Sequence, residues 1–284
     1  MIKYIQNRKY NYIFSGLLIT LSIYFLLVYR LDVAIDFTGG TNWNLETTLK
    51  TDEIKKIINN NKVEVYKIDA KDGVYNLSLA PTTSEQKNKI LDELKGKDKN
   101  ILENKFETIG PSLGRELLIK TLIAVTLSSI AIMLYVSYQF NESVFGVSAI
   151  IAMIHDALIL IGSFSVLGHF YGVQVDSLFV TAVLTILSFS VHDTIVVFDR
   201  YREVRKNQPK MVLEEQMNLA INSTMVRSLN NSITSAIMLF SVFLLGGESI
   251  KWFGLALFIG IVIGTYSSPF VATPLVYEWL KRRR

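Results

Sequence analysis

Residues 177–198 read SLFVTAVLTILSFSVHDTIVVF, an apolar run that holds one acidic side chain, Asp193. An α-helix needs about 20 mostly apolar residues to cross the hydrocarbon core of a bilayer. An ionisable side chain at the centre of such a helix costs roughly 2.5–3.5 kcal/mol on insertion scales, and it persists where it is paired, hydrated or functional. The run therefore predicts a membrane-spanning helix built around a carboxylate.

Further runs of this kind lie on both sides of the first. They cover Tyr10–Tyr29, Thr121–Asn141, Ser143–Val175, Ser228–Gly247 and Trp252–Tyr277. The sequence therefore predicts a polytopic α-helical membrane protein with six transmembrane helices. The first helix lies within residues 1–30, and the others form a bundle in residues 116–284, at about 117–138, 144–168, 177–198, 224–246 and 251–277. The first run is expected to remain as an anchor, because it is too long for the apolar region of a signal peptide and no small-x-small cleavage site follows it.

The composition excludes several other classes of protein. Only 19% of the 284 residues are charged, compared with about 25% in soluble domains, and the charges lie mostly between the apolar runs. This distribution excludes a soluble globule, a disordered chain and a nucleic-acid-binding domain. The chain has no cysteine and three histidines, so the sequence predicts no disulfide, no cysteine nucleophile and no metal site. It also has no G-x-x-x-x-G-K-[ST] motif, so neither ATP hydrolysis nor a bound cofactor is expected.

The distribution of Lys and Arg predicts how the chain is oriented. Basic residues concentrate before the first span, in the connection 199–223 after the fourth span, and after the sixth span. With six spans these segments all lie on one side, and the positive-inside rule assigns that side to the cytoplasm. Both termini are therefore predicted to be cytoplasmic, and residues 31–115 are predicted to be extracytoplasmic.

Residues 31–115 predict a small α+β domain. Strands are expected at Ile35–Leu45, Val63–Ile68, Val74–Leu79 and Glu103–Ile109, with Gly39-Gly40 as a turn or bulge and Asp72-Gly73 as a hairpin turn. Helices are expected to begin at Thr51 and to cover Ser84–Lys95. The order β-α-β-β-α-β is ferredoxin-like, and in that fold the first and last strands are neighbours. The segments 36–40 and 110–114 are therefore expected to lie close together.

Asp193 has a candidate partner on the following span. Arg227 lies at a similar depth if that helix begins near Ala220, and consecutive spans are antiparallel, so the two side chains can face each other. Two interpretations follow from these residues. The first is a structural ion pair between two helices. The second is a carboxylate that binds and releases a proton, with the neighbouring arginine shifting the pKa of that carboxylate.

Polar residues recur at helical spacing beside both groups. The fourth span carries Thr181, Thr185, Ser188 and His192, and the fifth carries Arg227, Asn231 and Thr234. Two such rows favour a hydrated ion path, although rows of this kind also form plain interhelical hydrogen bonds. In the third span, His155-Asp156 supplies a second candidate carboxylate, which acts either as a relay or as a buried, hydrogen-bonded residue.

The sixth span combines small residues with a proline. Ala256, Gly260, Gly264 and Ser268 follow one another at intervals of four, which favours close helix packing within the bundle or against a partner. The adjoining Ser267-Ser268-Pro269 predicts a kink.

Several of these segments resemble motifs of the SecD/SecF family of protein-export membrane proteins, in the resistance-nodulation-division superfamily. They are Asp36-Phe37-Thr38-Gly39-Gly40, Gly110-Pro111-Ser112, His155-Asp156, His192–Arg200 and Gly264-Thr265-Tyr266-Ser267-Ser268. They follow the family's order over nearly the whole chain. The resemblance implies that Asp193 is the family's intramembrane aspartate and Arg227 its arginine. Two departures, His192 where many members have Asn and the start of the fifth span at Ser228–Ser235, leave both H+ and Na+ open as the coupling ion.

The resemblance also implies a function and partners. It predicts a subunit of the SecF type, which joins SecD in a SecDF complex of the bacterial cytoplasmic membrane. Such a complex uses the proton or sodium motive force to promote late steps of preprotein translocation. SecYEG, YajC, YidC, the preprotein and membrane lipid are the implied contacts, and no nucleic acid is expected.

Two functions of other classes stay open at this level. A small-molecule or lipid exporter of the same superfamily would use the same intramembrane acid, with a larger extracytoplasmic portion on a longer chain. A scaffold that only stabilises the translocon would keep Asp193 and Arg227 as a structural pair. Lost export by Asp193→Asn with intact assembly would contradict the scaffold, and drug accumulation on deletion with normal export would favour the exporter.

Overall fold

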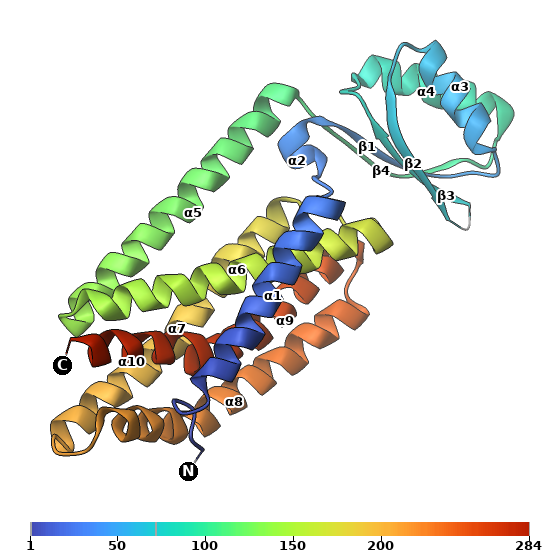
Figure 1. The fold of residues 1–284 in the computed structure, drawn as a ribbon. Coiled ribbons are helices and arrows are strands. Elements are labelled where there is room, and N and C mark those ends of the chain that lie inside the picture. The colour runs from blue at the N-terminus through green and yellow to red at the C-terminus, as the bar shows by residue number, and fades with distance from the viewer. Residues whose placement is uncertain (1, 72, 284) are drawn as a thin grey trace. The chain divides into compact units, whose positions relative to one another are not determined.

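The chain forms two compact units in the computed structural model, which describes residues 2–71 and 73–283 (Figure 1). One unit comprises the residues up to Asp32 together with those from Ala124 onward, and the other comprises Val33–Ile123. Asp72, half of the predicted hairpin signal, lies outside the described residues.

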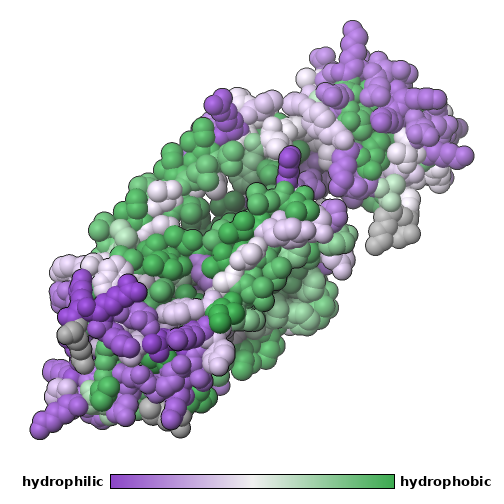
Figure 2. Space-filling view, viewed as in Figure 1, coloured by the Kyte–Doolittle hydropathy of each residue, from purple (hydrophilic) through white to green (hydrophobic). Residues whose placement is uncertain are grey.

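The first unit contains the long apolar helices, except for the beginning of the second of them, up to Ile123, which belongs to the second unit. They are α1 (Arg8–Tyr29), α5 (Pro111–Phe140), α6 (Ser143–Tyr171), α7 (Ser177–Asn207), α8 (Leu213–Leu245) and α9 (Glu248–Ser267), which continues through a π-helical turn, η1 (Ser268–Ala272), into α10 (Thr273–Arg282). Among the described residues, six helical segments are long and apolar enough to cross a membrane, which confirms the predicted number. Figure 2 shows hydrophobic side chains over the visible face of these helices and hydrophilic ones gathered near α10 and the α7–α8 connection.

The connection after the fourth span differs from its prediction. Residues 199–223 were expected to form a loop, but α7 continues to Asn207 and α8 already begins at Leu213. The extensions are helical because each keeps an inward apolar face, with Tyr201 and Val204 buried on α7 and Met217 and Ile221 on α8. Charged side chains on the other faces therefore mark the end of the apolar run and do not mark the end of the helix.

Close packing of α9 against α7 confirms the prediction from the small residues of the sixth span. A Cβ atom at Gly260 would overlap the side chain of Ile186 on α7, and one at Gly264 would lie 3.3 Å from the Cβ of Ser190. The helices therefore approach each other within this chain at these glycines. The predicted kink takes the form of η1, where Pro269 has no N–H to donate.

The second unit is an antiparallel sheet with helices. Its elements are α2 (Ile35–Thr38), β1 (Gly40–Glu46), α3 (Thr51–Asn60), β2 (Val65–Lys71), β3 (Val74–Leu79), α4 (Ser84–Lys97) and β4 (Leu102–Ile109). The described strands follow the order β2-β3-β1-β4, so the first and last strands are neighbours, as predicted. Trp43, Leu45, Leu77 and Leu79 of the sheet form one buried cluster with Ile54 and Ile58 of α3 and Ile90 and Leu94 of α4.

The start of the first strand was predicted incorrectly. Residues 35–38 form a helical turn, α2, and the strand begins only at Gly40. The two glycines explain the difference, because Gly39 has φ 72° and Gly40 has φ 135°, values that L side chains rarely adopt. The glycines therefore end the turn and redirect the chain into the sheet.

The two motifs on either side of this domain lie together, as expected. A Cβ atom at Gly39 would lie 2.6 Å from the Cα of Pro111, and one at Gly114 would lie 2.8 Å from the backbone nitrogen of Gly39. The backbone at the end of α2 is therefore in direct contact with the backbone at the start of α5, with no side chain between them.

Asp98 gives this unit a predictable pH dependence. Its carboxylate is buried and accepts hydrogen bonds from the Thr47 hydroxyl at 2.6 Å and from the backbone N–H groups of Thr48 and Asn100, both at 2.9 Å. These donors hold the pKa of Asp98 well below its usual range. Because the pKa is depressed on folding, this contribution to stability is complete above about pH 4 and is lost as the pH falls through the folded value.

We therefore expect the amides of β1 and α4 to lose protection in hydrogen exchange as the pH falls below about 4, after correction for intrinsic rates. Asp98→Asn is expected to lower protection at neutral pH and to weaken the acid dependence. The exposed Asp92 of α4 supplies the control Asp92→Asn, which should leave both unchanged. Equal acid sensitivity of the Asp98→Asn and wild-type chains would contradict this account.

Candidate functional site

Asp193 is buried in the first unit, which contains the apolar helices and is called the membrane unit below. It lies on α7, is 4% exposed, and its Oδ2 accepts a hydrogen bond from the Ser228 hydroxyl of α8 at 2.5 Å. The apolar residues around Asp193 make α7 long enough to cross a membrane. Other parts of the same unit cover the carboxylate. The site thus joins an ionisable group to the neighbouring helix through one hydroxyl.

Arg227 does not make the direct contact with Asp193 that the sequence suggested. No hydrogen bond or ion pair involves Arg227 within the described part of the chain, and its side chain is exposed. Successive residues of an α-helix point about 100° apart, so a helix that turns Ser228 toward α7 directs Arg227 to the side. Ser228 therefore holds the position that was expected for Arg227.

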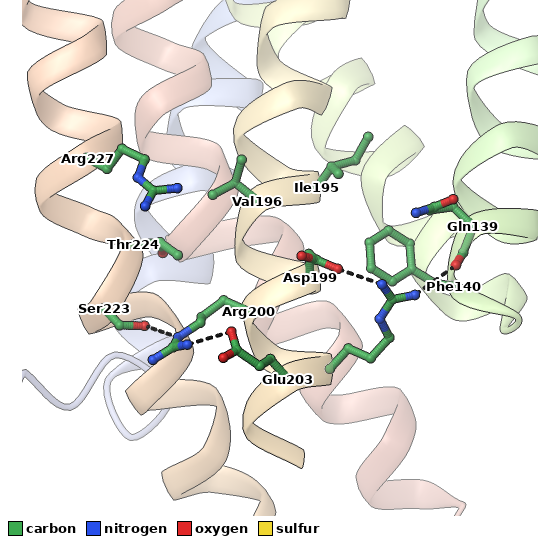
Figure 3. Close-up of a pocket in the computed structure, with 11 residues that line it drawn as sticks. Gln139, Phe140, Ile195, Val196, Asp199, Arg200, Glu203, Ser223, Thr224 and Arg227 are labelled. Atoms are coloured by element: carbon green, nitrogen blue, oxygen red, sulfur yellow. Dashed lines mark hydrogen bonds and ion pairs between the residues drawn. The ribbon is translucent and has the colours of Figure 1, made fainter. Parts of the chain in front are cut away.

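The Arg227 side chain lines a cavity of about 720 Å³. This cavity is lined by residues from the end of α5, from α7 and from α8, and Figure 3 shows Arg227 extending from α8 toward α7. The other arginines of the cavity are paired. Arg200 donates to Glu203 at 2.5 Å and to Ser223 at 2.9 Å, and Arg202 donates to Asp199 at 2.7 Å.

Two lining residues of the cavity are close in sequence to the buried carboxylate and its partner. Val196 lines the cavity from α7 and follows Asp193 by about one turn, while Thr224 lines it from α8 and precedes Ser228 by about one turn. The Asp193–Ser228 contact is therefore roughly one helical turn beyond two lining residues of the cavity. This arrangement can bring water and small ions close to a carboxylate inside the membrane unit.

The polar rows of the fourth and fifth spans lie on other faces than predicted. The side chains of Thr181, Thr185, Ser188 and His192 on α7, and of Asn230, Asn231 and Thr234 on α8, are all exposed. The buried polar groups of α7 are instead Ser190, Asp193 and Thr194. His192, Ser188, Asn231 and Thr234 thus form outward-facing rows and do not line the Asp193–Ser228 contact.

His155 and Asp156 form a second buried polar cluster. Asp156 is fully buried on α6, and its Oδ2 accepts hydrogen bonds from Ser190 of α7 at 2.5 Å and from Ser267 of α9 at 2.6 Å. Nδ1 of His155 lies 2.8 Å from Oδ1 of Asp156. Ser268 begins the π-helical turn beside it and shares a hydrogen bond of 2.9 Å with Thr194.

Sequence reasoning missed Ser190, Thr194 and Ser228 as members of these sites. A serine or threonine in a membrane helix often bonds only to its own backbone, so the residue type alone gives no signal. Ser190 and Thr194 are four positions apart on α7 and therefore share one face of that helix, which is the pattern that could have identified these two.

The comparisons with known proteins agree with this architecture. The family model described as protein export membrane protein SecD/SecF, C-terminal, matches residues 89–282. The chain belongs to the SecD/SecF family. The SecF subunit of the protein translocase of Thermobaculum terrenum is 36% identical, over 98% of this chain and 94% of the relative. The corresponding subunit of Synechocystis is 34% identical, over 97% of this chain and 93% of the relative.

A solved SecD/SecF structure matches the fold as well. SecDF of Thermus thermophilus, described as a translocon-associated membrane protein, is 30% identical with a TM-score of 0.86. The match covers 99% of this chain and 39% of the SecDF chain, so this chain spans well under half of that relative's length. The family and the apolar helices together identify a multi-pass membrane protein.

Proposed function

We propose that this chain is the SecF subunit of a SecDF complex and that it uses an ion gradient to promote late steps of preprotein translocation. Its relatives are named as translocase subunits of this kind, which supports the role in protein export. The observation that carries the ion-coupled mechanism is the carboxylate of Asp193, which is buried, hydrogen-bonded to α8 and about one helical turn from a cavity.

Ionisation of Asp193 is the step through which the gradient acts. One elementary charge moved through 100 mV is worth about 2.3 kcal/mol. When Asp193 is charged, its carboxylate attracts the Ser228 hydroxyl and the positive charge of Arg227 in the adjoining cavity. When it binds a proton or a sodium ion, this attraction falls, and the contact between α7 and α8 is free to rearrange.

The proposed orientation follows from the basic residues of the sequence. The cavity and both termini face the cytoplasm, and the ferredoxin-like domain of residues 31–115 is extracytoplasmic. Movement of α7 and α8 would reach that domain along the chain through α1 and α5, which flank it in the sequence. The translocating preprotein is the substrate on that side, and SecYEG is the channel that it leaves.

The outward polar rows of α7 and α8 support a SecD-type partner in the membrane. Hydroxyl, amide and imidazole groups are costly to expose to lipid tails, and helices of a partner protein can satisfy them. The name SecDF of the solved relative supports SecD as that partner. We assign the exposed Ser188 and His192 of α7 and Asn231 of α8 to this contact. Thr185 and Thr234 of the same rows already donate to backbone oxygens of their own helices, at 2.7 and 2.8 Å. YajC, YidC and lipid are proposed as peripheral contacts.

The proposal is tested with the complex of this chain and its SecD-type partner in sealed vesicles. We expect an imposed potential to drive uptake of H+ or Na+, followed separately with a pH-sensitive and a sodium-sensitive dye. Preproteins arrested late in translocation should complete their passage when the gradient is applied without further ATP. Vesicles that hold the assembled complex yet move neither ion would overturn the mechanism and favour the scaffold.

A further inference from the structure

The His155–Asp156 cluster holds a buried polar atom that has no partner in the described residues. His155 is 3% exposed, and its Nε2 makes no hydrogen bond. Its other ring nitrogen, Nδ1, lies 2.8 Å from Oδ1 of Asp156. A buried ring nitrogen without a partner is costly, so its chemical state needs an explanation.

The two hydroxyl donors at Asp156 fit an ionised carboxylate. Its Oδ2 accepts from the hydroxyls of Ser190 and Ser267, each of which can donate only one proton. With both hydroxyls donating, the remaining contact at Oδ1 is filled by an Nδ1–H group of His155. A neutral imidazole with hydrogen on Nδ1 has a bare lone pair on Nε2. With Asp156 ionised, the unpartnered atom is a proton acceptor.

Charge balance also favours a proton at this atom. With a neutral imidazole, the cluster carries one uncompensated negative charge in the interior, which is strongly unfavourable. Addition of a proton to Nε2 converts the ring to an imidazolium whose Nδ1–H still faces Asp156, and the buried charges then form a compensated pair. The carboxylate keeps its three donors throughout.

Few other ionisable groups face this pair. The sequence of α1 between Lys9 and Arg30 is uncharged, as is the sequence of α9 and η1 between Lys251 and Glu278, and Glu278 of α10 is paired with Arg8. Tyr266 of α9 packs against the His155 ring with centroids 6.3 Å apart. On α7 the ionisable groups are Asp193, on the buried face, and His192, on the exposed face.

The contacts of this pair and Asp193 lie on one short segment of α7. Ser190, which donates to Asp156, precedes Asp193 by about one turn of α7. Thr194 follows Asp193 directly, bonds to the backbone oxygen of Ser190 at 3.0 Å and shares a hydrogen bond with Ser268 at 2.9 Å. A change of charge at either carboxylate therefore acts on the same short segment of α7.

We propose that His155 and Asp156 form a second proton-binding site, in which Nε2 of His155 takes up the proton and Asp156 holds the resulting imidazolium. The proton comes from water, no covalent bond between heavy atoms forms or breaks, and the release step returns the same proton. The inference rests on the proposed function in taking the proton as a coupling ion, and it adds a site that the Asp193 mechanism does not use.

Nuclear magnetic resonance of ¹⁵N-labelled histidine tests the site directly, because the chain has only three histidines. The double variant His169→Gln/His192→Asn, in the assembled complex in lipid, leaves His155 as the only histidine of this chain. Asn keeps a polar group at position 192, which is assigned to the partner contact. The partner chain is produced without label. At an alkaline pH we expect hydrogen on Nδ1 and a bare Nε2, and at an acidic pH we expect both nitrogens to carry hydrogen.

Asp156→Asn in the same background should abolish the doubly protonated form, because the imidazolium loses its counter-charge. Asp193→Asn, which leaves the Asp156 contacts in place, should retain it. A spectrum in which Nε2 already carries hydrogen at high pH, or does not change between the two pH values, would overturn the proposal. If Asp193→Asn still abolishes ion uptake in that case, the proposed function stands without this second site.

Discussion

Replacement of Asp193 by Asn is expected to abolish ion-driven export while the chain still folds and assembles with its SecD-type partner. Asn has nearly the same shape, and its amide can hydrogen-bond to the Ser228 hydroxyl, which lies 2.5 Å from Asp193 Oδ2 in the wild-type chain. The amide does not ionise, so this position no longer exchanges a proton or a sodium ion. A neutral amide also costs less to bury than a carboxylate, so stability should not fall.

Three measurements in vesicles check this result. Ion uptake under an imposed potential should fall to the level of vesicles without the complex, and completion of arrested preproteins should fall with it. The thermal unfolding midpoint of the complex should stay at or above the wild-type value. Ion uptake at the wild-type rate by the assembled variant would remove Asp193 from the mechanism.

Asp199→Asn is the matched control, because it makes the same chemical change on the same helix, at an exposed carboxylate that lines the cavity but takes no part in the Asp193–Ser228 contact. Asp199 pairs with Arg202 at 2.7 Å, but the two side chains are 61% and 51% exposed. An exposed ion pair contributes about 0–1 kcal/mol to stability, so ion uptake and export should stay near wild type. A difference between the two variants isolates burial of the carboxylate as the property that matters.

The fold could be predicted from the sequence wherever one residue pattern determines one structure. Long apolar runs predicted the number of membrane helices. In the second unit, the buried residues of α3 and α4 recur at helical spacing, and they include Ile54, Ile58, Ile90 and Leu94. The segment 35–38 was assigned wrongly because Ile and Phe suit a strand as well as a helical turn. The backbone angles of Gly39 and Gly40 decide between the two, and a sequence does not contain them.

The site was harder to predict because it depends on the rotation of each helix. Asp193 could be identified from its apolar surroundings alone. Its contact with Ser228 could not, since a rotation of about 100° would have presented Arg227 instead. The same limit applies to α7, where His192 is adjacent to Asp193 in sequence but lies on the exposed face. Helix rotation is set by packing, for example of Gly260 against Ile186, and only the folded chain reveals it.

Gly39→Ala is expected to destabilise the unit of residues 33–123 by about 3 kcal/mol or more, from two causes that add. The first is backbone conformation. Gly39 has φ 72° and ψ 162°, a region that is essentially restricted to glycine and costs other residues about 1–3 kcal/mol. The second is steric, because the new Cβ would lie 2.6 Å from the Cα and 2.9 Å from the nitrogen of Pro111. Both of these atoms are backbone, so no side-chain rotation relieves the overlap.

Hydrogen exchange of the full chain measures this effect, read at the amides of β1 and β4, which pair directly. Gly96→Ala is a control of opposite sign, since Gly96 lies in α4 with no atom within 4 Å of an added Cβ. Gly96 lies in the last turn of α4, and alanine is favoured over glycine by up to about 0.5–1 kcal/mol in a helix, so that variant should gain protection. Wild-type protection in Gly39→Ala would mean that α2 and the start of α5 can move apart freely. A loss confined to β1, β4 and α2 would show that the close backbone contact at Gly39 holds the two ends of the domain together.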